Sequence, residues 1–123
     1  MAERNYDRKE QYDKIKAALL PNEVLEYVFD MKGGGTGFLG VTDKRIIFYD
    51  KVFLLKMKAV VSVPYSQVQS LAAEDESGLL AGRGFFSSSH LIVNTAHGTF
   101  EFEFRGADKA HMAHNMIMAH LFS

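Results

Sequence analysis

The sequence has no cysteine, no excess of either charge and no long apolar stretch, and each absence argues against a class of protein. Without cysteine, neither a disulfide framework nor a thiolate zinc site can form, which fits a reducing compartment. The 14 basic and 15 acidic residues argue against general nucleic-acid binding, which needs an excess of basic residues. No apolar run approaches the ~20 residues that span a bilayer, and the charged N-terminus does not resemble a signal peptide. We therefore predict a cytoplasmic protein.

The remaining composition is typical of a soluble globular domain. Hydrophobic residues make up 47% and charged residues 24% of the 123 positions. This length suits a single domain over 1–123, which would bury roughly two-thirds of the surface of its unfolded chain. We expect an N-terminal helix over 3–20, a β-rich region over 22–105 and a C-terminal helix over 107–121.

Both expected helices have an apolar stripe at helical spacing. In the first helix the stripe is interleaved with charged residues, and Pro21 ends the helix. This stripe either packs on the rest of the domain or binds a partner. The C-terminal helix follows Gly106, and its wider stripe suits a helix that lies over a sheet. The two stripes consist of Tyr12, Ile15, Ala18 and Leu19, and of Ala110, Ala113, Ile117 and Leu121, widened by Met112 and Met116.

Alternating apolar and polar residues predict about seven antiparallel strands between the helices. In the first strand, Leu25, Tyr27, Phe29 and Met31 share one face, and we expect the other face to meet solvent. A Thr-Asp-Lys-Arg corner at 42–45 joins the next two strands. The last strand places its three Phe residues, at 100, 102 and 104, on one face that must be buried. The expected strands are 22–32, 38–41, 45–49, 59–63, 71–74, 85–95 and 99–105.

Four segments in the same order resemble a bacterial pleckstrin-homology (PH) domain of the PH and GRAM superfamily. They are Leu-Pro-Asn-Glu-Val at 20–24, Val-Thr-Asp-Lys-Arg-Ile-Ile at 41–47, Ser-Val-Pro-Tyr-Ser-Gln-Val at 62–68, and 98–104. The resemblance implies an α+β, mainly β fold. In that fold, about seven antiparallel strands form a partly open PH-like barrel of two near-orthogonal sheets, capped by the C-terminal helix, and the N-terminal helix is an addition.

The same resemblance implies a binding or scaffolding unit without catalytic residues, and bacterial members resemble self-assembling domains. Lipid-binding eukaryotic relatives hold phosphate with Lys and Arg beside the first hairpin loop. Here that loop, 32–37, has one Lys and no Arg, and its glycines lack the pattern of a phosphate-binding P-loop. A flexible turn is therefore the preferred interpretation of this loop.

We predict no catalytic site, metal site or cofactor. Ser89 and His90 are adjacent on a strand, so they point to opposite faces and cannot act as a nucleophile and its base. His111 and His114 share a helix face, but no cysteine and few carboxylates are near to complete a zinc site. They are interpreted as surface histidines.

The strongest candidate for function is an apolar block among lysines, consisting of Lys51, Val52, Phe53, Leu54, Leu55, Lys56 and Lys58. Three interpretations stay open: the core-facing ends of two strands, an oligomer interface, or a tip that enters an anionic membrane surface, to which each lysine adds ~1 kcal/mol of attraction. We expect a non-enzymatic module that acts through protein contacts, including homo-oligomerisation through strand edges or this segment. The alternative is a peripheral membrane-binding domain. A small-molecule carrier would rest only on the many Phe and Met residues, so no such ligand is predicted.

Overall fold

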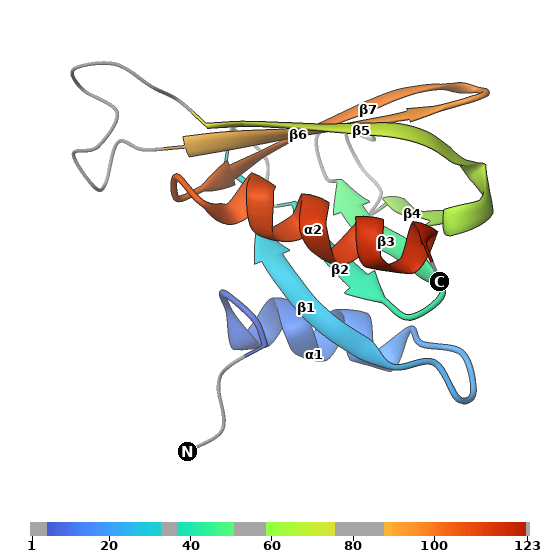
Figure 1. The fold of residues 1–123 in the computed structure, drawn as a ribbon. Coiled ribbons are helices and arrows are strands. Elements are labelled where there is room, and N and C mark those ends of the chain that lie inside the picture. The colour runs from blue at the N-terminus through green and yellow to red at the C-terminus, as the bar shows by residue number, and fades with distance from the viewer. Residues whose placement is uncertain (1–4, 33–36, 51–58, 76–87, 123) are drawn as a thin grey trace.

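Two antiparallel sheets form the body of the computed structural model, which describes residues 5–32, 37–50, 59–75 and 88–122 (Figure 1). The first sheet has the strand order β1-β2-β3-β4, and the second has the order β5-β6-β7. The first contains β1 (Leu25–Asp30), β2 (Phe38–Thr42), β3 (Arg45–Asp50) and β4 (Ala59–Pro64), and the second contains β5 (Val68–Asp75), β6 (Ser88–Thr95) and β7 (Gly98–Arg105). A short 3-10 helix, η1 (Tyr65–Gln67), joins the sheets, and the helices are α1 (Lys9–Ala17) and α2 (Lys109–Leu121).

Aromatic rings from both sheets fill the space between them. The ring of Phe29 on β1 lies 5.3 Å from that of Phe104 on β7, and Phe48 on β3 lies 4.9 Å from Phe102. The prediction that the three phenylalanines of β7 share an inward face is confirmed for Phe102 and Phe104, which are buried, whereas Phe100 is half-buried. Each large ring buries a large apolar area, so these contacts help to hold the two sheets together.

The helix α2 closes one end of the barrel and contacts mainly β5 and β6 (Figure 1). Its predicted stripe is confirmed for Ala110, Ala113 and Ile117, which are fully buried, and for the partly buried Met116 and Leu121, whereas Met112 is exposed. The buried Ser89 Oγ accepts a hydrogen bond from the Ala110 amide at 2.9 Å, so a strand residue satisfies a donor at the start of the helix. Local sequence could not reveal this partner, which is 21 residues away.

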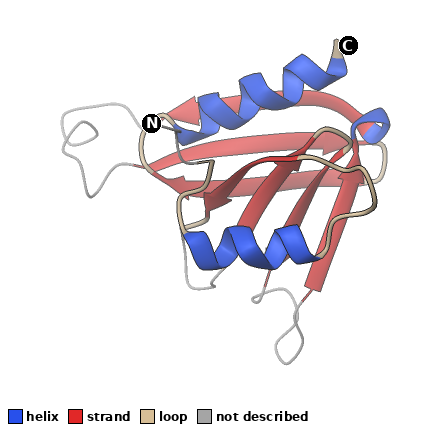
Figure 2. Ribbon diagram, turned by 90° about the horizontal axis from the view of Figure 1, so that it is seen from below, coloured by secondary structure: helices blue, strands red, loops and turns tan. Residues whose placement is uncertain are grey.

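The helix α1 lies on the outer face of the first sheet (Figure 2). Its stripe packs inward as expected: Ile15 is fully buried and sits over Gly40 of β2. The expectation that the second face of β1 meets solvent is wrong, because Val28 and Asp30 are buried beneath this segment of the chain. The Gln11 Nε2 donates to Asp30 Oδ1 at 2.9 Å, so the polar residue under α1 has a partner.

The element boundaries differ from the sequence predictions chiefly at chain reversals. The first helix begins at Lys9 instead of residue 3, because the chain before it pairs with β1 in an extended conformation. The fifth strand begins at Val68 instead of Leu71, because η1 completes the turn after Pro64 within three residues. Within the described residues, no helix is long and apolar enough to cross a membrane.

Candidate functional site

The two edge strands of the first sheet differ in whether other segments of the chain pair with them. The β1 edge is occupied: Tyr6 forms a parallel bridge with Val28, and the Val28 amide donates to the Asn5 carbonyl at 3.2 Å. Farther along the same edge, the Lys32 amide donates to the Glu103 carbonyl of β7 at 2.7 Å. The N-terminal segment and β7 therefore use the hydrogen-bonding groups that this edge would otherwise present to solvent.

The opposite edge of the sheet is β4, which pairs with β3 and with no other strand among the described residues. Its sequence, Ala-Val-Val-Ser-Val-Pro, contains no charged residue, and Val60 is 49% exposed. Proteins usually protect an edge strand with charges, a bulge or a covering segment, because a free edge can pair with another chain. Within the described residues β4 has none of these three protections, and only Pro64, which lacks an amide donor, limits pairing at the end of the strand.

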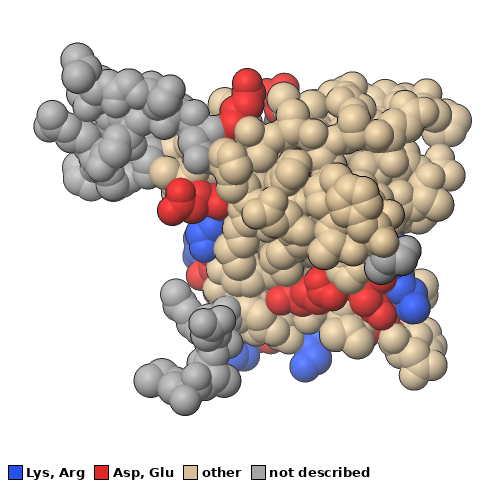
Figure 3. All heavy atoms as spheres, in the orientation of Figure 1, with Lys and Arg blue, Asp and Glu red and all other residues tan. Residues whose placement is uncertain are grey.

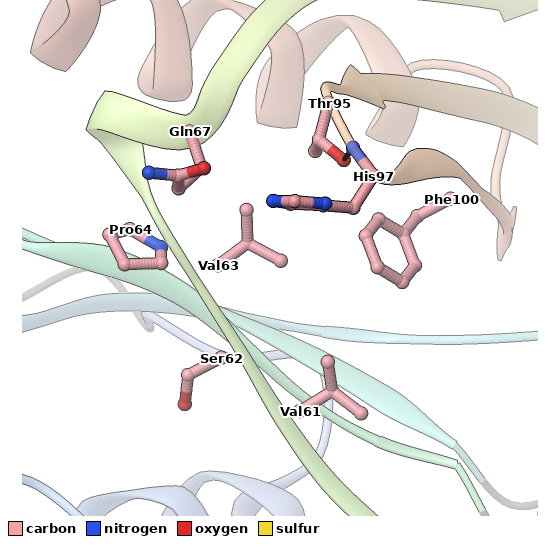
Figure 4. A pocket seen from close by; sticks show the side chains of 8 residues that line it. All are labelled: Val61, Ser62, Val63, Pro64, Gln67, Thr95, His97 and Phe100. Atoms are coloured by element: carbon pink, nitrogen blue, oxygen red, sulfur yellow. Dashed lines mark hydrogen bonds between the residues drawn. The ribbon is translucent and has the colours of Figure 1, made fainter.

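A pocket of about 160 Å³ runs along this β4 edge (Figure 4). Four consecutive residues, Val61 to Pro64, line it. Neighbouring strand residues point to opposite faces, so Val61 and Val63 line the pocket from the inner face of β4, whereas the exposed Ser62 and Pro64 border it at the edge of the strand. Gln67, Thr95, His97 and Phe100 form the facing wall, which comes from η1 and the β6–β7 hairpin.

The facing wall is held in place by the turn between β6 and β7. The Thr95 Oγ1 donates to the Gly98 carbonyl at 2.9 Å and accepts from the His97 amide at 3.2 Å. Gly98 has φ +147°, a conformation that residues with a side chain rarely adopt. Phe100 is fixed from behind by an edge-on contact with Phe48, with their ring centroids 5.5 Å apart. The exposed His97 ring thus lies between Gln67 and Phe100 at the pocket mouth (Figure 4).

The size and lining of the pocket restrict what it can bind. Pockets for small molecules typically measure ~300 to 1,000 Å³, so this volume is closer to that of a single side chain. Valines, Pro64 and Phe100 supply apolar surface, and no charged residue is among those that line the pocket. This lining suits an aliphatic side chain, and the described residues that form it include no Lys or Arg to pair with a phosphate.

The pocket is next to a corner stabilised by a buried ion pair. The Arg45 Nε donates to Glu23 Oε2 at 2.9 Å, where the side chain of Glu23 is fully buried and that of Arg45 is 16% exposed. The hydrogen bond from Arg45 is the main cause that lowers the pKa of Glu23 to about 2, and hydrogen bonds from the Leu20 amide and the Thr42 hydroxyl also lower it against the opposing effect of burial. The last residue of the predicted Thr-Asp-Lys-Arg corner thus has a buried acidic partner.

Tyr65 links this corner to the pocket and to α2. Its hydroxyl donates to the Thr42 carbonyl at 2.6 Å, and burial, followed by nearby carboxylates, raises the pKa of that hydroxyl. Its ring stacks on His120 with centroids 4.9 Å apart, and His120 Nε2 lies 2.8 Å from Glu26 Oε1. Three of the segments that carry the family resemblance, 20–24, 41–47 and 62–68, thus meet at this structural corner.

The candidate site residues from the sequence do not come together in the described part of the structure. The candidate segment Lys51 to Lys58 and most of the glycine run lie outside the described residues. Ser89 and His90 do not meet: Ser89 Oγ donates to the Gly106 carbonyl at 2.8 Å, while His90 Nε2 lies 3.3 Å from Glu103 on the neighbouring strand. In the described part of the chain, no group of three or more His, Asp or Glu residues could hold a metal ion.

The sequence interpretation missed the pocket itself. Its walls come from residues 61–67 and 95–100, which are about thirty positions apart and share no motif. One signal was available, because the β4 run is uncharged and rich in β-branched residues, as edge strands seldom are. That pattern was interpreted only as an ordinary fourth strand.

Two antiparallel sheets joined at one corner and capped by a C-terminal helix define a PH-like fold. The chain belongs to the bacterial PH domain family, whose model matches residues 19–118. It is 33% identical over 91 residues to the uncharacterized protein YozO of Bacillus subtilis, an alignment that covers 74% of this chain and 72% of YozO. The crystal structure of a pleckstrin homology domain from Shewanella amazonensis matches with a TM-score of 0.66 and 21% identity, over 95% of this chain and all of that one. This likeness confirms the predicted fold.

Proposed function

We propose that this chain is a non-enzymatic scaffolding module that self-associates by pairing the free edge of β4 with β4 of a second copy. The observation that carries the proposal is the contrast between the two edges of the first sheet. The chain covers the β1 edge with its own N-terminal segment, whereas the uncharged β4 edge pairs with no further described strand. Addition of a strand to a free edge is a common mode of protein recognition.

The chemistry of β4 favours a second copy as the partner. In an antiparallel pair related by a two-fold axis, the strand pairs with its own sequence in the reverse direction, so charges of one sign on it would be brought together in one short interface. None of the six residues of β4 is charged, and this penalty is absent. The edge strand of the second sheet, β5, is less suited, because it carries the exposed Glu74 and lies against α2.

Substitution of an outward-facing valine tests this function. Val60→Lys places a charge on the edge strand, which is how natural edge strands resist pairing, and each copy would bring that charge into the same short interface. We expect the dissociation constant of the dimer to rise at least tenfold, measured by sedimentation equilibrium over a range of protein concentrations up to ~1 mM. The matched control is Val24→Lys, because Val24 is also an exposed valine, at 59% against 49%, and lies outside β4. A wild-type chain that stays monomeric throughout, or equal effects of the two substitutions, would refute the proposal.

Peripheral membrane binding through Lys51 to Lys58 is the alternative function. It depends on a segment outside the described residues. On the face that Figure 3 shows, Asp and Glu gather in a band below α2. Sedimentation with vesicles that contain anionic lipid separates the two functions. Binding that falls with salt and with Phe53→Asp would support the membrane function, and a Val60→Lys effect restricted to self-association would support the scaffold.

A further inference from the structure

The pocket beside β4 offers an apolar space, which the pairing of two backbone edges does not require. Between the inner face of β4 and the β6–β7 hairpin lies an apolar space of about 160 Å³, bounded by Val61 and Val63 on one side and Phe100 on the other. Val63 is 5% exposed, so its side chain points into the protein, whereas the side chains of Ser62 and Pro64 are exposed. The inner row of β4 therefore continues into an open space at the edge of the sheet.

A strand paired with β4 would cross the mouth of this space. Paired strands lie ~4.7 to 4.9 Å apart, and residues directly opposite each other point to the same face of the sheet. If the partner is a second β4 in antiparallel orientation, the inner positions opposite Val61 and Val63 are again valines. The side chain of such a valine points toward Phe100, into the pocket.

We infer that the pocket is a socket that receives Val61 or Val63 from β4 of the partner, and that the same contact is made in return by the two-fold symmetry. This inference rests on the proposed self-association and specifies its contact. A reciprocal contact closes the assembly at two copies, whereas a one-way contact would continue into a chain of copies. One six-residue strand and one socket form a contact smaller than the ~1,200 to 2,000 Å² of a stable interface, so we expect a weak dimer.

The test fills the socket without changing β4. In His97→Trp, a larger ring replaces an exposed imidazole at the pocket mouth, in a turn whose hydrogen bonds involve the backbone of residue 97. Ala96→Trp is the control, because Ala96 is exposed in the same turn and does not line the pocket. The sequence has no other Trp, so the emission of each variant reports the surroundings of its own indole. A bluer emission for His97→Trp than for Ala96→Trp would show that the indole lies in the pocket.

Sedimentation equilibrium then measures dimerisation of both variants. The socket predicts a rise of at least tenfold in the dimer dissociation constant for His97→Trp, less than threefold for Ala96→Trp, and no species larger than a dimer in the wild type. If Val60→Lys weakens the dimer and His97→Trp does not, edge pairing stands and the socket is wrong. If the wild type is monomeric, both the inference and the proposed function are wrong.

An independent measurement does not depend on any substitution. In a mixture of isotope-labelled and unlabelled wild-type chains, filtered NMR experiments detect contacts between copies only. The socket predicts contacts from the methyl groups of Val61 or Val63 to the ring of Phe100 in the other copy. Contacts between copies that involve only backbone atoms of β4 would overturn the socket and keep the edge pairing.

Discussion

Replacing Gly40 by alanine tests how α1 is held on the first sheet. A Cβ atom at Gly40 would lie 2.8 Å from Ile15 Cδ1 and 3.1 Å from Ile15 Cγ2, well inside the ~3.5 to 4.0 Å of a favourable carbon contact. Ile15 is fully buried, so it can yield only if α1 lifts or its side chain leaves a preferred rotamer. Overpacking of this kind costs about 1 to 3 kcal/mol, while the loss of chain flexibility on replacing glycine returns about 0.4 to 1 kcal/mol. We expect a net loss of about 1 to 2 kcal/mol.

A double-mutant cycle isolates the contact between these two residues. Ile15→Val removes Cδ1, the atom nearest to the new Cβ, at a cost of about 0.5 to 1.5 kcal/mol on its own. Combined with Gly40→Ala, it relieves the clash, so the double variant should be about 1 kcal/mol more stable than the sum of the single effects predicts. The measurement is the free energy of unfolding in urea, followed by far-ultraviolet circular dichroism.

The control for the cycle is Ile47→Val. Its Cγ2 lies 3.3 Å from the same Cβ position, and Cγ2 is kept in valine, so it should not relieve the clash. If the effects of Gly40→Ala and Ile15→Val add within ~0.5 kcal/mol, the two residues do not interact and the docking of α1 over Gly40 is refuted.

Two further predictions concern buried polar pairs. The pKa of Glu23 is lowered to about 2, so the ionised carboxylate stabilises the fold at pH values above its ordinary pKa of 4.5. The contribution is on the order of 2 kcal/mol after allowance for solvent screening. It should be lost as the pH falls from about 5 to 2. Urea unfolding at a series of pH values should show a flatter dependence for Glu23→Gln, and parallel curves for both proteins would contradict the assignment. Lys109 Nζ lies 2.7 Å from Asp7 Oδ1 and 3.1 Å from the Tyr27 hydroxyl; burial lowers the pKa of Lys109, but these two partners outweigh it and raise the pKa above 10.5. Lys109→Met should cost about 1 kcal/mol at neutral pH, measured by the same unfolding assay, and an unchanged stability would show that the pair contributes nothing.

Periodicity in the sequence determined which residues share a face. The alternation of Phe100, Phe102 and Phe104 and the stripe of α2 follow from side-chain geometry within one element, and the structure has both apart from the exposed Met112. The PH-like fold could be predicted from this periodicity together with the four short segments that resemble a bacterial PH domain. The boundaries were less accurate where a turn depends on distant partners, as at η1.

Only the tertiary structure decided what covers each face and each edge. Alternation in β1 cannot show that α1 buries its second face, nor that Asp7 reaches Lys109 across 102 positions. The pocket beside β4 likewise arises where residues 61–67 and 95–100 come together. Periodicity reports how one element is oriented, whereas a binding surface depends on which elements meet, and long-range packing of the whole chain determines that.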